Sequence, residues 1–171
     1  MTPPYALTVD AGTPDPRAAD HLLHAVAAEL ALPGDVFGCT HLVRGDRPHV
    51  AVSLARPAGP LPRTVPERLT ERGYDVTPGV PEAAGRAVLY PGAASLTGTL
   101  TVADLLARSA IDAVTVLGTP ERPAPHTLLV TRDHVRPQWR DGRLVLAAVP
   151  AAGGTLVPFE VPNPTPCCAD H

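Results

Sequence analysis

Proline and glycine spacing constrains the fold of this chain more than any other feature of its sequence. The 171 residues include 22 prolines and 14 glycines, spread along the chain with proline clusters at residues 57–62 and 120–125. Proline has no N–H donor and a fixed φ, so it is excluded from helix interiors and central strands. The sequence therefore predicts many short helices and strands joined by stiff loops.

The composition indicates a packed core and excludes several kinds of chemistry. Hydrophobic residues make up 44% of the chain and aromatic residues only 4%, so alanine, valine and leucine must fill the core. All 14 basic residues are arginines, which excludes lysine-dependent chemistry such as Schiff bases and is typical of a GC-rich bacterial genome. The net charge of −3 argues against nucleic-acid binding, which requires neutralised phosphates.

The cysteine count and the N-terminal segment favour a cytoplasmic protein. Residues 1–5 carry no basic or apolar signal sequence, and no apolar run reaches the roughly 20 residues that span a membrane. The 3 cysteines are an odd number, which indicates free thiols in a reducing compartment and no disulfide framework. We therefore expect neither a membrane nor a nucleic-acid partner.

The first half of the sequence predicts a β-α-β-β-α-β order. Asp15 is an N-cap and Pro16 takes the first helical position, and Thr64 with Glu67 matches a capping box. The apolar residues Ala18, Leu22, Val26 and Leu30 give the first helix its expected buried stripe. The order is that of the ferredoxin-like fold, so residues 1–80 are expected to form such a unit. The expected segments are strands at 5–10, 36–43, 49–55 and 74–77, and helices at 17–32 and 64–72.

The second half, residues 86–161, predicts a mostly antiparallel, β-rich unit packed against the first. Thr101 is a helix N-cap, and Asp141-Gly142 is the preferred pair for a two-residue hairpin turn. Residues 162–171 then form a proline-rich arm. The whole chain is therefore expected to be α+β. The expected strands are 86–90, 111–117, 127–132, 135–140, 143–149 and 155–161, with one helix at 101–109.

The C-terminal arm ends in residues that suit a thiophilic metal. Cys167, Cys168 and His171 lie within five residues of one another, after a proline-rich spacer at 162–166. Thiolate and imidazole ligands favour zinc or copper. In this one detail the arm resembles the cysteine-paired tail of mercuric reductases, which implies metal transfer. The alternative is a solvated terminus without a function.

Cys39 and His41 are candidate additional ligands for the same ion. They lie two positions apart in an expected strand and so face the same side. With the terminal residues they would complete four ligands. The alternative is that Cys39 belongs to the core, since cysteine is among the most buried residue types.

A row of basic residues is a second candidate site. In an unbroken strand Arg132, His134, Arg136 and Arg140 share one face, and such a face suits a phosphate or carboxylate. The alternatives are a solvated sheet face, or a strand that Asp133 interrupts.

Two weaker candidates are the histidine pair His21 and His24 on the first helix and the small-residue loop at 92–99. An exposed helix face and a surface loop are the alternatives.

The motifs of nucleotide-binding, zinc-protease and hydrolase sites are missing from the sequence, so whether the chain is an enzyme stays open. The sequence favours a protein that binds or delivers zinc or copper through its C-terminal arm, with a protein partner for that arm. The alternative is a binding module without metal that uses the arginine row for a small anion or a protein partner.

Overall fold

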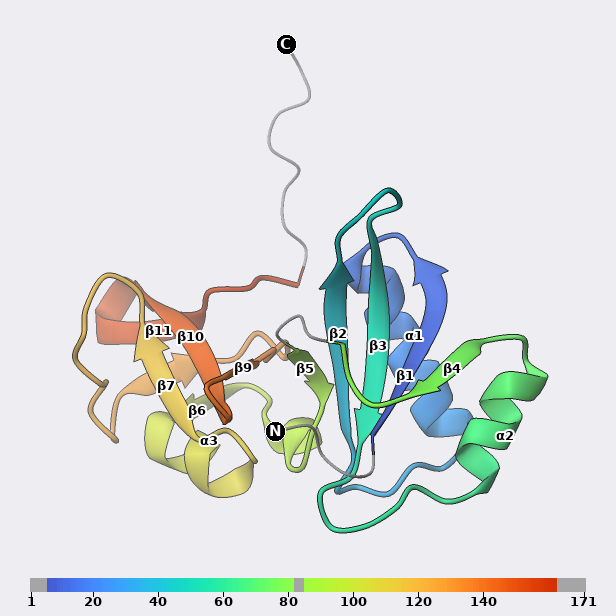
Figure 1. The fold of residues 1–171 in the computed structure, drawn as a ribbon. Coiled ribbons are helices and arrows are strands. Elements are labelled where there is room, and N and C mark those ends of the chain that lie inside the picture. Colours follow the sequence, from blue (N-terminus) through green and yellow to red (C-terminus); the bar gives the residue numbers. More distant parts are fainter. Residues whose placement is uncertain (1–5, 82–84, 163–171) are drawn as a thin grey trace. The chain divides into compact units, whose positions relative to one another are not determined.

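The computed structural model describes residues 6–81 and 85–162, and the chain divides into two compact units. Unit 1 comprises Met1–Ala93 with Gln138–Gly142, and unit 2 comprises Ala94–Pro137 with Arg143–His171. Both units contain helices and strands (Figure 1), and most strand pairs of the chain are antiparallel, so the chain is of the α+β class. Within the described residues, no helix is long and apolar enough to cross a membrane.

Unit 1 is an antiparallel sheet with strand order β4-β1-β3-β2-β5-β9. Its first six elements occur in the order β-α-β-β-α-β. The elements are β1 (Ala6–Thr13), α1 (Pro16–Glu29), β2 (Phe37–Val43), β3 (His49–Ala55), α2 (Thr64–Glu71), β4 (Asp75–Pro78), β5 (Arg86–Leu89) and β9 (Gln138–Arg140).

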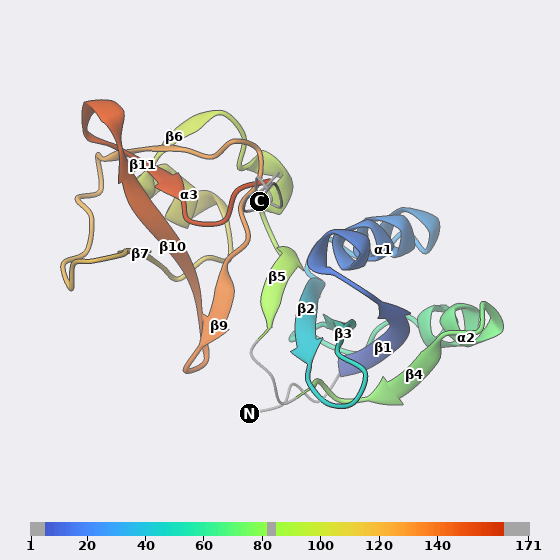
Figure 2. The ribbon, with the colours of Figure 1, turned by 90° about the horizontal axis from the view of Figure 1, so that it is seen from above.

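The two helices of unit 1 pack on the same face of its sheet (Figure 2), where the main hydrophobic core lies. Leu23 of α1 and Leu69 of α2 are both almost fully buried, and both belong to one cluster with alternate strand residues such as Val52. The opposite, helix-free face carries smaller and more polar side chains, and several of these are buried as well: Cys39, His41, Ala51, Ser53 and Ala55.

The start of α1 matches the prediction, but its buried stripe does not. Asp15 accepts a hydrogen bond from the Ala18 amide at 2.8 Å, as expected for an N-cap. The buried apolar residues are Ala19, Leu23 and Val26, whereas Leu22 and Leu30 of the predicted stripe are only partly buried against the same core. The predicted stripe is therefore shifted by about one residue and shares its fully buried position with the structure only at Val26. Steps of four and three residues follow the helical period of 3.6 more closely than uniform steps of four.

The predicted capping box at the start of α2 was also wrong. Thr64 is the first helical residue, and Arg63 precedes it in a helical conformation without a side-chain cap. The backbone explains the shift, because the Val65 amide donates to the Pro62 carbonyl at 2.9 Å. The turn therefore begins before Thr64, and its hydroxyl cannot take the N-cap position.

Unit 2 has the strand order β7-β10-β11-β8-β6. The β7–β10 and β8–β11 pairs are parallel, and the β10–β11 and β6–β8 pairs are antiparallel. Its core includes Leu105, Leu129, Leu144 and Leu146. The elements are β6 (Thr99–Thr101), α3 (Val102–Arg108), β7 (Ala113–Val116), β8 (Leu128–Val130), β10 (Arg143–Ala151), the 3-10 turn η2 (Ala152–Gly154) and β11 (Thr155–Pro158), and the 3-10 turn η1 (Ala93–Ser95) lies at the boundary with unit 1.

Two local predictions in this part of the chain are confirmed. Thr101 accepts a hydrogen bond from the Asp104 amide at 3.0 Å and caps α3. Between β9 and β10, Asp141 has φ 50° and Gly142 has φ 76°, the left-handed pair that a two-residue hairpin turn of this type needs.

The predicted strands at 127–132 and 135–140 are much shorter than expected. β8 ends at Val130 and β9 begins at Gln138. Between them Arg132 and Asp133 have φ values of 55° and 53°, and two consecutive non-glycine residues in left-handed backbone interrupt a regular strand. The structure therefore adopts the alternative in which the strand is interrupted at Asp133.

Candidate functional site

The predicted metal ligands of the C-terminal arm, Cys167, Cys168 and His171, lie outside the described residues. The zinc or copper site at the arm therefore stays a prediction. In the part of the chain that the structure describes, no group of three or more histidine, cysteine, aspartate or glutamate side chains is placed to hold a metal ion.

Cys39 lies on the helix-free face of unit 1 in surroundings that oppose metal ligation. Its side chain is buried, and this burial raises the pKa of the thiol to about 12, although a hydrogen bond with Trp139 partly offsets the rise. Because the thiolate is the form that binds metals, Cys39 would have to lose a proton that its environment retains.

His41 is buried beside Cys39 and is engaged by the neighbouring strand. Its Nε2 atom lies 2.7 Å from the Ser53 hydroxyl. Close packing surrounds both residues, because a Cβ atom on Gly85 would lie 3.0 Å from His41 Cε1 and 3.2 Å from Cys39 Cβ. These contacts support the alternative in which the two residues are part of the packed interior.

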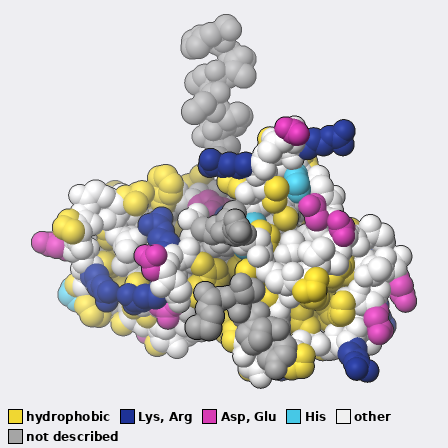
Figure 3. Space-filling view, in the orientation of Figure 1, with side chains coloured by type: hydrophobic (Ala, Val, Ile, Leu, Met, Phe, Trp, Pro, Cys, Tyr) yellow, Lys and Arg dark blue, Asp and Glu magenta, His cyan; other side chains and the backbone are white. Residues whose placement is uncertain are grey.

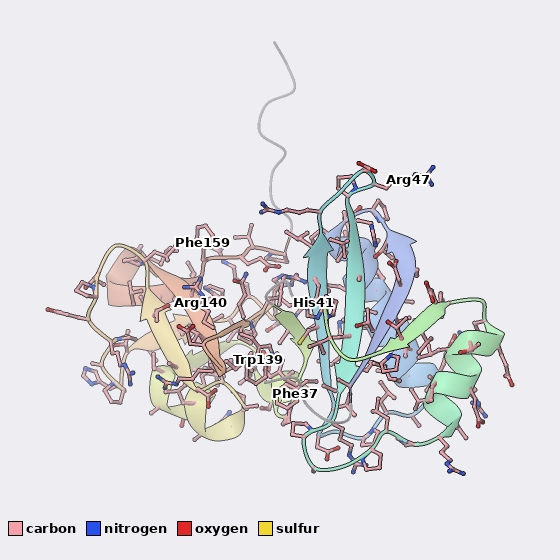
Figure 4. All side chains as sticks on the ribbon, viewed as in Figure 1. Phe37, His41, Arg47, Trp139, Arg140 and Phe159 are labelled. Atoms are coloured by element: carbon pink, nitrogen blue, oxygen red, sulfur yellow. The ribbon has the colours of Figure 1, made fainter. Side chains whose placement is uncertain are left out.

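Two aromatic residues continue this cluster (Figure 4). The ring centroids of Phe37 and Trp139 are 5.5 Å apart, with an interplanar angle of 52°. The Trp139 amide also donates to the Gly85 carbonyl at 2.9 Å. Tilted aromatic pairs add to the stability that burial gives, so the cluster attaches β9 to the sheet of unit 1.

The basic row predicted for an anion is not held on one strand. Arg132 lies in the left-handed turn, whereas His134 Nε2 lies 3.0 Å from Glu160 Oε1. Arg136 Nη1 donates to the Val135 carbonyl at 3.5 Å, and Arg140 belongs to unit 1. The alternation that placed the four on one face is therefore absent, and anion binding by these residues stays a prediction.

The turn at Arg132 and Asp133 instead closes a loop of unit 2. Asp133 Oδ1 accepts from the Gly98 amide at 2.8 Å, and the buried Thr131 hydroxyl donates to the Gly98 carbonyl at 2.7 Å. In the small-residue loop at 92–99, the Gly98 amide is thus bound to the Asp133 carboxylate. On α1, both His21 and His24 are exposed, as the alternative of an exposed helix face predicts.

Sequence reasoning missed a hollow in unit 1, between the start of α1 and the β2–β3 turn. It has a volume of about 250 Å³, and we call it the turn hollow. Arg44, His49 and Asp15 add charged groups to its lining, and Leu42 in its wall is 59% exposed. The apolar lining residues are Pro14, Pro16, Leu42, Val43, Pro48 and Val50.

No sequence signal could have found this hollow, because three separate segments build it. The loop before α1 supplies two prolines, and the ends of β2 and β3 supply the remaining walls. Figure 3 shows basic and acidic side chains close together at the end of unit 1 that carries the turn. Arg47 lies at the tip of this turn (Figure 4) and does not line the hollow.

His49, in the wall of the turn hollow, has an acceptor at each ring nitrogen. Nδ1 lies 2.8 Å from the Arg47 carbonyl, and Nε2 lies 2.7 Å from Asp10 Oδ2. The carbonyl, then the hydrogen bond and the charge of Asp10, raise the pKa of His49 above 6.5. The basic imidazole of His49 and the Arg44 guanidinium thus lie beside apolar walls.

No protein-family model, curated protein or solved structure matches this chain.

Proposed function

We propose that unit 1 is a non-catalytic binding module and that its ligand occupies the turn hollow. The observation that carries this proposal is the combination of walls and charge. Apolar side chains line an open hollow of about 250 Å³, and its charged lining is two basic side chains, Arg44 and His49, against the one carboxylate of Asp15. Small-molecule sites have mostly apolar walls and a few polar groups that fix the orientation of the ligand. The turn hollow has both components.

The chemistry of the lining favours a small ligand with an apolar body and one carboxylate. The volume of about 250 Å³ lies just below the range of roughly 300–1,000 Å³ for drug-sized ligands, which disfavours a nucleotide. Arg44 is exposed, and a guanidinium binds a carboxylate through paired N–H donors. Leu42, at 59% exposure, offers apolar surface that a ligand would remove from water.

The burial of the one serine–histidine pair described above supports binding rather than catalysis. Ser53 and His41 are only 2% and 4% exposed. A nucleophile and its base must reach a substrate, and side chains this deeply buried in a sheet do not. We place the function of unit 1 at the exposed end of β2.

We propose further that unit 1 has the ferredoxin-like fold. The strand order β4-β1-β3-β2, with antiparallel neighbours and both helices on one face, supports this assignment. The fold is shared by many unrelated functions, so it adds nothing to the choice of ligand.

The test is a titration of ¹⁵N-labelled protein with hexanoate, followed by NMR. The amide signals of Leu42, Val43 and Val50 are expected to shift. Leu42→Asp should abolish the shifts by placing a negative charge in the wall, and Arg44→Gln should weaken binding. The matched control is Arg47→Gln, since Arg47 is in the same turn but outside the lining. Equal shifts in all four proteins, or none in the wild type, would disprove the site.

A second proposal, independent of the first, is metal binding by the arm that ends in Cys167, Cys168 and His171. Its support is the sequence alone, because two thiols and an imidazole are ligand types that zinc and copper prefer. The surroundings of Cys39 and His41 give it no support, so the arm would act without them.

A further inference from the structure

Asp10 organises an irregularity in β1 next to the turn hollow. The register of β1 against β3 shifts between Val9 and Thr13, and Gly12 in this bulge has φ 63°. Asp10 Oδ1 accepts a hydrogen bond from the Gly12 amide at 2.9 Å. The second carboxylate oxygen is thereby left for a partner on another strand.

That partner is His49, which joins the bulge to the β2–β3 turn. Both acceptors that its ring faces, the Arg47 carbonyl at 2.8 Å and the Asp10 carboxylate at 2.7 Å, can only accept protons. Both ring nitrogens must therefore carry a hydrogen for both bonds to form. Only the imidazolium form has two N–H donors, so the geometry requires a protonated ring.

The other charged groups near this ring act in both directions. On β4, Asp75 lies directly opposite Asp10 in the strand register, and its negative charge favours the imidazolium. Arg44 and Arg47 in the turn oppose it, while Asp46 in the same turn and Asp15 before α1 favour it. The pKa of His49 is raised overall, with the Arg47 carbonyl as the largest cause.

We propose that His49 is a proton-operated latch that holds the wall of the turn hollow in place. When protonated, it connects the β2–β3 turn to the β1 bulge through its two hydrogen bonds. A neutral ring keeps one N–H, so it loses its bond to either Asp10 or the Arg47 carbonyl. With the bond to Asp10 lost, a nitrogen lone pair faces a carboxylate. The β2–β3 turn then loses its side-chain link to the bulge, which stays joined to β3 through the pairing of Thr13 with Val50.

The latch regulates the site that the proposed function assigns, and this part of the inference rests on that function. His49 and Pro48 both line the turn hollow. Release of the turn therefore removes part of the wall, and ligand binding is expected to weaken as the pH rises through the pKa of His49. The sign follows from the raised pKa: the stabilising contribution is present below it and is lost above it.

The latch is tested first without any ligand, on the whole chain. The Cε1–H signal of His49 is followed by NMR against pH, in the wild type and in Asp10→Asn. The wild-type midpoint should lie above 6.5, and the variant midpoint should move down toward that value. The exchange protection of the Gly12 amide should fall across the same pH range in the wild type. In His49→Gln it should not change with pH.

Two results would overturn the latch: a His49 midpoint at or below 6.5, or a midpoint that Asp10→Asn leaves unchanged. The hexanoate titration, repeated on either side of the midpoint, separates the latch from the proposed function. Binding that weakens several-fold above the midpoint in the wild type, and not in His49→Gln, supports the regulation. Shifts of the His49 and Gly12 signals with pH, without any hexanoate binding, would support the latch and disprove the binding site. Binding that is equal on both sides of the midpoint would disprove the regulation alone.

Discussion

The buried ion pair between Arg86 and Asp20 should contribute strongly to the stability of unit 1. Arg86 Nη1 lies 2.7 Å from Asp20 Oδ1, and Nη2 lies 3.1 Å from Oδ2, so the pair is bidentate. The two side chains are only 13% and 12% exposed. Arg86 Nη1 also donates to the Thr40 hydroxyl at 3.3 Å. The pair thus joins α1, β2 and β5.

Asp20→Ala should lower the free energy of unfolding by about 2–4 kcal/mol. Removal of one partner from a buried pair costs roughly 3–5 kcal/mol, because a charge remains in a poorly hydrated site. We place the expected loss somewhat lower because both groups keep some contact with water. The double variant Asp20→Leu with Arg86→Met leaves no buried charge, so it should lose less than Asp20→Ala does alone.

Urea unfolding followed by tryptophan fluorescence measures this prediction, because Trp139 is the only tryptophan and belongs to unit 1. The matched control is Asp35→Asn, which breaks the more exposed pair with Arg56, at 31% and 40% exposure. That change should cost about 1 kcal/mol or less. A loss from Asp20→Ala no larger than that of the control, or a double variant that loses as much as Asp20→Ala or more, would refute the reasoning.

Three further predictions concern packing, the buried thiol and the arm. Gly38→Ala should destabilise unit 1 by about 1–3 kcal/mol, because a Cβ atom there would lie 2.9 Å from Leu89 Cδ1. The control is Gly59→Ala, which should be near neutral in the same urea experiment because nothing lies within 4 Å of its added Cβ atom. With Cys167 and Cys168 changed to serine, Cys39 should resist iodoacetamide at neutral pH until urea unfolds the chain; rapid labelling of the folded protein would contradict its raised pKa. Because that pKa lies above the unfolded value of 9.0, the contribution of the protonated thiol to stability should be lost as the pH rises toward 12. Cys167→Ser with Cys168→Ser should abolish zinc or copper(I) binding in a competition with a chromophoric chelator, and unchanged affinity would remove the metal proposal.

Much of unit 1 could be predicted from local signals. Asp15 and Pro16 mark the start of α1, and alternating apolar residues mark β3. The Asp141-Gly142 turn was equally readable, because few residue pairs tolerate two left-handed positions. These features depend on residues that are neighbours in the sequence.

The addition of β5 and β9 to the sheet could not be predicted in the same way. Arg86 pairs with Gln138, and no local pattern links strands so distant in the sequence. The left-handed conformation of Arg132 was also unreadable, because its support comes from the distant Gly98, which bonds both Thr131 and Asp133.

The candidate site shows the same limit. The bond between His41 and Ser53 depends on the register of β2 against β3, and the bond between His49 and Asp10 depends on a bulge in β1. Neither register nor bulge is encoded by one residue. The turn hollow is built from segments that depend on both features, so no single sequence pattern identifies its residues.

Intermolecular NOEs between hexanoate and methyl-labelled protein test the central claim most directly, because they locate the ligand. The turn hollow predicts contacts from the hexanoate chain to the methyl groups of Leu42, Val43 and Val50. The Arg47→Gln protein should give the same contacts, and Leu42→Asp should give none. Contacts to exposed apolar residues of unit 2 instead, such as Leu128 or Phe159, would contradict the account.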